Sequence, residues 1–247
     1  ETGDESSKIA RNVPVTRDVT LDEKMVAHLG LYKERVGPLA TKEVGRVRED
    51  LMRATDDAGN SPLGQLIADA QLDAARARGA AQVAFMNVGG VRDNLTLAPS
   101  KEEGEGVVTY EELHRVQPFG NTLVTMTLSG EQILELLESQ WQDTGRARML
   151  QPSAGFAYTF DASKPRGARI VSGSVTLAGE PFDLARSYRV TVNSFLAAGG
   201  DGFKVFLRGT NTVAGPIDLD AFVEHVARTS PLVPPGAKRI SKVEAAQ

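Results

Sequence analysis

The chain has 247 residues, of which 41% are hydrophobic, 24% are charged and none is cysteine, and its formal net charge is −4. This length fits one large domain or two small ones and can bury a sizeable core. The composition excludes disulfides and cysteine chemistry, offers no overall basic field to a nucleic acid polymer, and contains no apolar run long enough for a membrane span.

The first part of the chain predicts a linker followed by a helix. Residues 1–17 are polar and irregular, which predicts a disordered or linker start. A helix is predicted over about 21–37, because apolar residues recur there at helical spacing, with Thr20 as its N-cap and Pro38 as its end. A short strand is expected over 42–48.

The clearest predicted element is a helix over 61–79. Ser61 is suited to its N-cap, Pro62 to its first turn and Gly79 to its end. The residues expected on its buried face are Leu63, Leu66, Ile67, Ala70 and Ala74. A buried strand over 83–86 follows and ends at Asn87.

The rest of the chain mixes helices and strands without a regular alternation. Helices are expected from Asp218 or Asp220 to about Arg228, over 131–141, and over 109–116, where T-Y-E-E resembles a capping box. Strands are expected over 123–128, 156–160, 169–171, 174–177, 188–192 and, at a sheet edge, 238–243. Because strands and helices do not alternate regularly, the sequence predicts an α+β fold with a mixed sheet rather than a doubly wound fold.

The usual signatures of catalysis are missing from the sequence. The three histidines, His28, His114 and His225, are isolated from one another, so no H-E-x-x-H or H-x-H metal pair exists. Neither a G-x-S-x-G nucleophile elbow nor a phosphate-binding G-x-x-x-x-G-K-[S/T] loop occurs. The candidate residues are therefore suited to binding a ligand and include no evident general base or nucleophile.

Two segments combine glycines with a polar or charged group. In N87-V-G-G-V-R92, Asn87 stands at a strand end, Gly90 and its neighbour let the backbone approach a ligand, and Arg92 supplies a planar cation for a phosphate or carboxylate. In N193-S-F-L-A-A-G-G-D-G-F203, Asp201 lies in a glycine loop and can accept hydrogen bonds from two vicinal hydroxyls, as in ribose. The alternatives are a strand-to-loop turn with a solvated arginine, and a turn aspartate bonded to its own backbone.

Two phenylalanines and one further arginine complete the candidate site. Phe119 is held by the Q117-P-F-G120 turn, and Phe195 follows a strand end. A loop phenylalanine either plugs the edge of a core or forms a stacking platform for a flat ring. Arg53 is either a solvated surface residue or another cation of the site. Two aromatics for a base, an acid for a sugar, arginines for a phosphate and an asparagine for ring edges together indicate a nucleotide site.

These segments, in this order, resemble the C-terminal domain of the 5'-nucleotidase family, the bimetallic nucleotide phosphohydrolases. The resemblance covers about residues 14–243 and assigns the domain to residues 18–247. The matching segments are S61-P-L-G-Q-L-I-A-D-A70, N87-V-G-G-V-R92, V108-T-Y-E-E-L113, Q117-P-F-G120, L128-S-G-E-Q-I-L134, Y188-R-V-T-V-N193 and F195-L-A-A-G-G-D-G-F203.

The resemblance implies a layered α/β sandwich with a mixed sheet that binds a nucleotide or nucleoside. By resemblance, Phe119 and Phe195 stack on the base. Asn87 contacts the base, with Gly90 in the same loop, and Asp201 binds the ribose hydroxyls. Arg92 and Arg53 hold the phosphate side. The family often shows a third glycine where this chain has Val88, and Arg48 is an alternative to Arg53.

The resemblance also implies a partner, an N-terminal metallophosphatase domain of the same polypeptide that carries two divalent metal ions and a catalytic His–Asp pair. No metallophosphatase signature occurs in this chain, so we expect no cofactor in it and no hydrolysis by it alone. A secreted, periplasmic or cell-surface location is expected. The same domain in a cyclic-nucleotide phosphodiesterase or a UDP-sugar hydrolase, and a non-enzymatic surface binding module, remain as alternatives.

Overall fold

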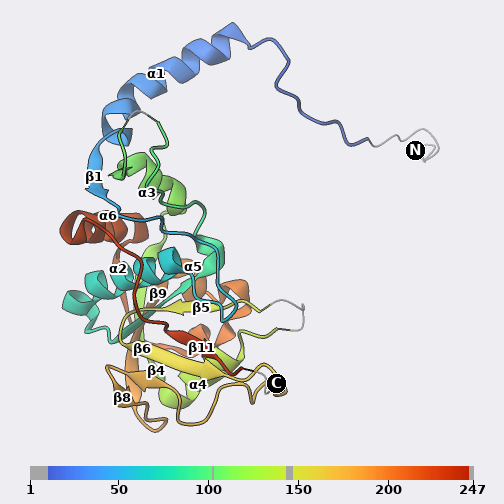
Figure 1. The fold of residues 1–247 in the computed structure, drawn as a ribbon, viewed down its shortest axis with the longest axis vertical. Coiled ribbons are helices and arrows are strands. Elements are labelled where there is room, and N and C mark those ends of the chain that lie inside the picture. Colours follow the sequence, from blue (N-terminus) through green and yellow to red (C-terminus); the bar gives the residue numbers. More distant parts are fainter. Residues whose placement is uncertain (1–10, 102, 143–146, 245–247) are drawn as a thin grey trace, which may run out of the picture. The chain divides into compact units, whose positions relative to one another are not determined.

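The structure is a computed structural model that describes residues 11–101, 103–142 and 147–244 (Figure 1). The chain separates into two compact units, Glu1–Pro38 and Leu39–Gln247. The described residues form helices α1 (Glu23–Ala40), α2 (Pro62–Gly79), α3 (Tyr110–Val116), α4 (Gly130–Glu138), α5 (Ser194–Ala197) and α6 (Asp218–Thr229). The strands are β1 (Glu43–Arg46), β2 (Val83–Asn87), β3 (Val107–Thr109), β4 (Thr122–Ser129), β5 (Leu150–Pro152), β6 (Phe156–Phe160), β7 (Thr176–Leu177), β8 (Glu180–Pro181), β9 (Ser187–Asn193), β10 (Thr210–Ile217) and β11 (Ile240–Lys242).

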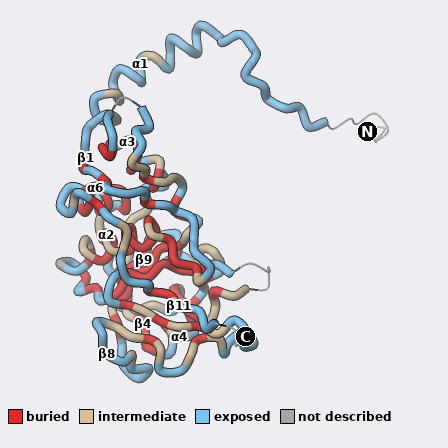
Figure 2. Tube along the Cα trace, viewed as in Figure 1, coloured by how far each residue is buried: buried red, intermediate tan, exposed pale blue. Residues whose placement is uncertain are grey.

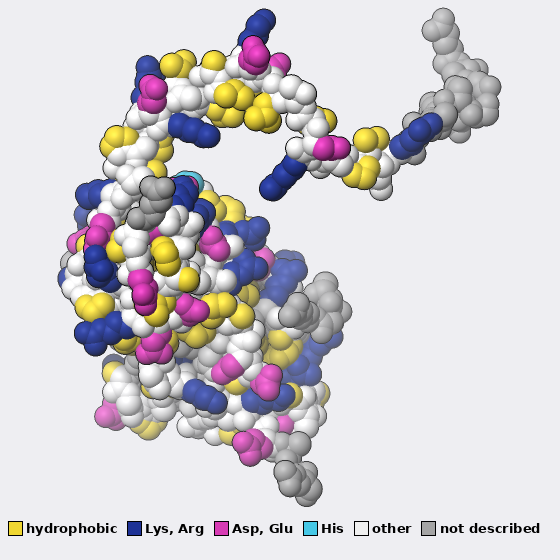
Figure 3. Space-filling model, turned by 45° about the horizontal axis from the view of Figure 1, so that its top comes forward, with side chains coloured by type: hydrophobic (Ala, Val, Ile, Leu, Met, Phe, Trp, Pro, Cys, Tyr) yellow, Lys and Arg dark blue, Asp and Glu magenta, His cyan; other side chains and the backbone are white. Residues whose placement is uncertain are grey.

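Helix α1 differs from its prediction at both ends. Its cap is Asp22, whose Oδ1 accepts the backbone N–H of Met25 at 3.0 Å, so the prediction of Thr20 is wrong. The helix also continues through Pro38, which was predicted to end it, and ends at Ala40. Proline has no N–H to donate to the carbonyl four residues earlier, so the helix loses one backbone hydrogen bond at this position. None of its residues is buried (Figure 2), and its apolar side chains are exposed to solvent (Figure 3).

A five-stranded mixed sheet forms the centre of the second unit, in the order β10-β4-β9-β2-β5. Strands β2 and β9 are parallel, whereas the other neighbouring pairs in this sheet are antiparallel. Every residue of β2 is buried, because the strand lies inside the sheet and both faces are covered. Phe85 belongs to the core on one face and Met86 to the core on the other.

The layers on the two faces of this sheet differ in kind. On one face, α2, α3 and α6 contribute apolar side chains to a shared core that includes Leu63, Leu113 and Phe222. On the other face, α4 and a second sheet, in the order β11-β6-β7-β8, enclose a core that includes Phe156 and Tyr158. The predicted α+β fold with a mixed sheet and layered architecture is therefore confirmed.

Helix α2 shows which local predictions hold. The Ser61 side chain accepts the N–H of Gly64 at 3.1 Å, so the predicted N-cap is confirmed. At the other end the left-handed position is taken by Ala80, with φ of 50°, and not by Gly79. Gly79 serves packing instead, because an added Cβ there would lie 2.9 Å from the side chain of Thr125 in β4.

The remaining differences concern short or irregular strands. The predicted strand over 169–171 is reduced to an isolated bridge between Ile170 and Phe160, and α4 ends at Glu138 instead of residue 141. Strands β3, β5, β8 and β10 were not predicted, and β10 contains Gly215 and Pro216. Among the described residues, no helix combines the length and the apolar character required to cross a bilayer.

Candidate functional site

Three chain segments meet at one edge of the central sheet. Strand β2 ends at Asn87 and its parallel neighbour β9 ends at Asn193, so both carboxyl ends lie at the same edge. The antiparallel strand β4 starts there, since Leu123 pairs with Asn193, and the loop before β4 carries Phe119. Residues that follow strand ends at such an edge commonly form ligand sites in α/β sheets.

The edge of the sheet opens into a cavity of about 480 Å³. All the sequence-predicted site residues except Arg53 line it, and they come from the loops after β2 and β9 and before β4. The lining residues are Asn87, Gly89, Gly90, Arg92, Phe119, Asn121, Asn193, Phe195 and Asp201. The structure therefore brings together side chains that are up to 114 residues apart in the sequence.

The two phenylalanines of the cavity are unusually exposed for their size. Phe119 is 56% exposed and Phe195 is 47% exposed, so neither is a core plug. The ring of Phe195 lies against the backbone of Gly200, where an added Cβ would come within 2.6 Å of ring carbons. The guanidinium carbon of Arg92 lies 5.8 Å from the ring centroid of Phe119, within the range of a cation–π contact.

Asn193 links the two sides of the cavity through one buried amide. Its Oδ1 accepts the N–H of Leu196 at 2.9 Å and so caps α5, the helix that carries Phe195. Its Nδ2 donates to Oδ1 of Asn87 at 3.0 Å. The orientation of Asn87 and the position of Phe195 therefore depend on the same side chain.

Asp201 stands in the left-handed backbone region, with φ of 55°. Its backbone carbonyl accepts Nε2 of Gln142 at 2.6 Å and Nη1 of Arg148 at 3.0 Å, which hold this strained turn. The carboxylate oxygen Oδ2 of Asp201 accepts a hydrogen bond from Nδ2 of Asn87 at 2.9 Å. The other carboxylate oxygen, Oδ1, lies 3.4 Å from Nη1 of Arg148. A carboxylate has about four acceptor positions, so capacity remains for ligand hydroxyls.

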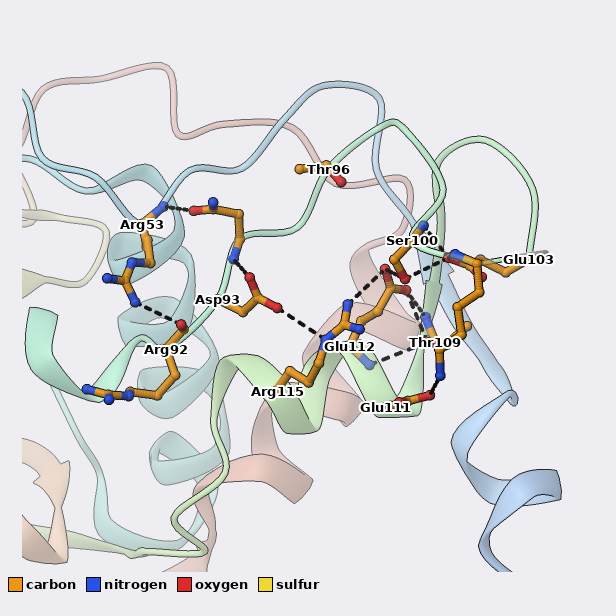
Figure 4. Close-up of polar contacts among 12 residues, drawn as sticks. Arg53, Arg92, Asp93, Thr96, Ser100, Glu103, Thr109, Glu111, Glu112 and Arg115 are labelled. Carbon is orange, nitrogen blue, oxygen red and sulfur yellow. Dashed lines mark hydrogen bonds and ion pairs between the residues drawn. The ribbon is translucent and has the colours of Figure 1, made fainter. Parts of the chain in front are cut away.

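Arg53 reaches the site from the segment before α2. Its Nη1 donates to the carbonyl of Arg92 at 2.8 Å and to that of Val91 at 3.3 Å, and its backbone N–H donates to Asn94 (Figure 4). It lines a second cavity of about 750 Å³ that shares Asn87, Gly89 and Asp201 with the first. Arg48 lines neither cavity, so the geometry favours Arg53 over Arg48 as the additional cation.

The loop after Arg92 is anchored on α3, as Figure 4 shows. Asp93 Oδ2 lies 3.1 Å from Nε of Arg115 in an ion pair. The buried carboxylate of Glu112 accepts the backbone N–H of Thr109 at 2.8 Å, which confirms the predicted capping box, and the hydroxyl of Ser100 at 3.0 Å. The arginine-bearing loop is thus tied to the helical layer at both of its ends.

Sequence reasoning did not assign Asn121, Asn193 or Arg148 to the site. Asn121 directly follows the turn that carries Phe119; its Nδ2 donates to Oδ2 of the buried Asp218 at 3.1 Å, and its Oδ1 lies 3.2 Å from the hydroxyl of Ser194. Burial raises the pKa of Asp218 above its ordinary value. Asparagine at a strand end was a usable signal for Asn193, whereas no local motif marks Arg148.

The part of the chain that the structure describes contains no group of three or more histidine, aspartate or glutamate side chains arranged to hold a metal ion.

Comparisons with known proteins give matches over most of the chain. Residues 38–208 match the family described as "5'-nucleotidase, C-terminal domain". The cell wall protein Lmo0130 of Listeria monocytogenes is 32% identical over 85% of this chain, and the trifunctional nucleotide phosphoesterase YfkN of Bacillus subtilis is 28% identical over 94%. This chain spans only 28% and 16% of those two proteins.

A solved structure shows the same fold. The 5'-nucleotidase precursor from Thermus thermophilus superposes with a TM-score of 0.71 and 30% identity, over 90% of this chain and 43% of that protein. The family match extends over more than half of the chain and agrees with this fold. The chain belongs to the 5'-nucleotidase C-terminal domain family.

Proposed function

We propose that this chain is the substrate-binding and specificity domain of a 5'-nucleotidase-type phosphohydrolase, and that it binds the nucleoside part of a nucleotide. The observation that carries the proposal is the pair of half-exposed phenylalanines, Phe119 and Phe195, in one cavity with Asp201 and Asn87. An apolar side chain of this size is costly to expose unless a ligand covers it. A purine or pyrimidine ring is flat and suited to cover both rings.

Each neighbouring group suits one part of a nucleotide. Asp201 retains free acceptor positions for the ribose hydroxyls. The amides of Asn87 and Asn121 offer a donor and an acceptor to the edge of a base. Arg92 and Arg53 supply fixed cations to a phosphate, and the carbonyl contact of Arg53 with Arg92 keeps these two residues adjacent.

The hydrolytic step belongs in this proposal to an N-terminal metallophosphatase domain of the same polypeptide, which would hold two divalent metal ions. The greater length of the relatives supports a further domain. The exposed apolar side chains of α1 support a packing surface for such a domain, since an amphipathic helix ordinarily buries its apolar stripe. We assign the binding domain to residues 18–247, and the similarity to a cell wall protein supports a secreted or cell-surface location.

The test is a calorimetric titration of the chain, without added metal, with adenosine, adenosine 5'-phosphate and ribose 5-phosphate. We expect adenosine and adenosine 5'-phosphate to bind in the micromolar to millimolar range, which corresponds to roughly −4 to −8 kcal/mol. Ribose 5-phosphate should bind much more weakly, because it lacks the ring that stacks. Equal binding of all three ligands, or of none, would contradict the proposal.

A hydrolysis assay completes the test. The chain should release no phosphate from adenosine 5'-phosphate with or without divalent metal, since the described residues offer no metal cluster. Metal-dependent hydrolysis that persists after further purification would contradict the proposal that a separate N-terminal domain carries out the hydrolysis.

A further inference from the structure

Asp218 is a buried carboxylate that lies outside both cavities and is bonded to a residue that lines one of them. It is the first residue of α6. Its Oδ2 accepts a hydrogen bond from Nδ2 of Asn121 at 3.1 Å, and its Oδ1 accepts the backbone N–H of Leu219 at 2.8 Å. Asn121 lines the cavity that holds the two phenylalanines, whereas Asp218 lines neither cavity. Any effect of Asp218 on a bound ligand is therefore indirect.

The backbone holds Asp218 and Asn121 side by side. The N–H of Asp218 donates to the carbonyl of Asn121 at 2.8 Å. The residues next to them, Ile217 at the end of β10 and Thr122 at the start of β4, are paired in the sheet. Because α6 follows β10 directly, the sheet sets the position of the carboxylate relative to Asn121.

The carboxylate decides which end of the Asn121 amide faces it. The two ends of an asparagine amide are similar in shape but opposite in hydrogen-bonding character, and an ionised carboxylate only accepts hydrogen bonds. Burial raises the pKa of Asp218, whereas the N–H groups that donate to it favour the ionised form. Asp218 therefore takes the Nδ2 end, and Oδ1 of Asn121 accepts the hydroxyl of Ser194 at 3.2 Å.

This orientation affects both sides of the cavity. Asn121 follows Phe119 by two residues, and Ser194 directly precedes Phe195, so their hydrogen bond joins the turn of one phenylalanine to the helix of the other. The carbonyl oxygen of an amide has two lone pairs, so Oδ1 keeps one acceptor position after the contact with Ser194. If the amide turned over, a ligand would meet a donor in place of this acceptor.

We propose that Asp218 is a positioning residue of the binding site: it holds the amide of Asn121 in the orientation that presents the carbonyl oxygen as an acceptor to a bound nucleoside. The inference rests on the proposed function, because it presupposes that a nucleoside occupies the cavity. It adds a buried residue outside the cavity to those that decide which hydrogen bonds the site offers.

The experiment exchanges donor and acceptor between the two positions. Asp218→Asn retains an oxygen for the N–H of Leu219 and directs its NH₂ group at Asn121, whose amide must then turn over. We expect calorimetry to show adenosine binding about fivefold weaker, the effect of one hydrogen bond. Adding Asn121→Asp restores an acceptor opposite that NH₂ group and an oxygen toward the ligand, so the affinity should return to within about twofold of the wild type.

Asp69→Asn is the matched control. Asp69 also accepts a backbone N–H, that of Ala154 at 2.6 Å, and a side-chain donor, Nη2 of Arg239 at 2.7 Å, but it lines neither cavity. This substitution should lower the free energy of unfolding in urea and leave adenosine affinity unchanged. Affinity that falls as much in the control as in Asp218→Asn would mean that Asp218 has only a structural role, and would overturn the inference.

The remaining outcomes separate the inference from the proposed function. If adenosine binds the wild type and Asp218→Asn equally, or if the double variant binds no better than Asp218→Asn, the inference is wrong and the proposed function stands. If adenosine does not bind the wild type, the proposed function fails and the inference falls with it.

A measurement on the wild type applies even where Asp218→Asn does not fold. In proton–nitrogen correlation NMR spectra, adenosine should shift the side-chain amide signals of Asn121 and leave those of Asn60, which lines neither cavity, in place. Signals of Asn121 that do not move at saturating adenosine would show that its amide does not meet the ligand, and would overturn the inference.

Discussion

Replacing Phe195 by alanine tests the stacking assignment most directly. Base–aromatic stacking contributes roughly 1–3 kcal/mol per base. A loss of this size corresponds to an affinity for adenosine that is about five- to 150-fold weaker. Ribose 5-phosphate, which has no base, should bind equally weakly to the wild type and to Phe195→Ala.

The structure also indicates what this substitution should do to stability. Phe195 is 47% exposed, so only about half of the roughly 1.5–3 kcal/mol for burying such a side chain is at risk. The helix α5 keeps its cap from Asn193 in the variant. We therefore expect the free energy of unfolding to fall by about 1 kcal/mol, and the chain to remain folded at 25 °C.

The assay is calorimetry at 25 °C, with urea unfolding of each variant as a check on the fold. Tyr32→Ala is the matched control, since Tyr32 is an aromatic residue of similar exposure, 55%, that lines neither cavity. It should leave adenosine affinity unchanged. The stacking argument is refuted if Phe195→Ala binds adenosine as the wild type does, or loses no more affinity than the control.

Four further substitutions test the support of the site. Gly200→Ala should displace Phe195, because an added Cβ would lie 2.5 Å from its backbone carbonyl oxygen and 2.6 Å from its ring, and calorimetry should show adenosine binding weakened several-fold. Asn193→Ala should lower the free energy of unfolding in urea by about 0.5–2 kcal/mol through loss of the helix cap. Asn193→Asp keeps the cap but not the donation to Asn87, and it brings a buried carboxylate against Oδ1 of Asn87, so it should weaken adenosine binding and also lower the free energy of unfolding. Because burial raises the pKa of Asp218, the folded chain retains that proton to higher pH than the unfolded chain does, and the stability from this group falls as pH rises through the raised pKa. The unfolding free energy of the wild type minus that of Asp218→Asn should therefore increase as pH is lowered from 7 toward 4; a difference independent of pH would contradict this assignment.

The predictions that hold are those that depend on neighbouring residues. The Ser61 cap and the Thr109–Glu112 capping box were predictable, because a side chain three residues away satisfies a free amide at a helix start. The buried strand before Asn87 was predictable from its uninterrupted apolar run. These signals depend on residues close together in the sequence, and the tertiary contacts of the fold favour the same local structure.

Strand β10 shows where local signals fail. Its sequence includes Gly215 and Pro216, which disfavour strands, and most of its residues are exposed. The strand forms because it pairs with β4 at the edge of the sheet, with irregular register at two places. A proline is tolerated at such an edge, where fewer of its neighbours require a backbone donor. The pairing partner lies more than eighty residues earlier and leaves no trace in the local pattern.

The site divides in the same way. Phe119, Phe195 and Asp201 stand out in sequence because glycines and loops surround them, and the structure places all three around one cavity. Arg148 does not stand out, because it becomes relevant only through its distance from Asp201, a residue 53 positions later.

The pairing of the parallel strands β2 and β9 explains how the spacing between the side chains of the candidate site is fixed. Both strands end in asparagine, and the pairing brings these two amides to 3.0 Å from each other. One amide then caps the helix that carries Phe195, and the other donates to the carboxylate of Asp201. The groups assigned to the base and to the sugar are thus connected through two buried side chains of rigid strands, so that their spacing is set by the sheet and not by the glycine loop. The glycine loop supplies the left-handed turn and the close approach that Asp201 and Phe195 require, which accounts for flexible residues around a charge and an aromatic ring.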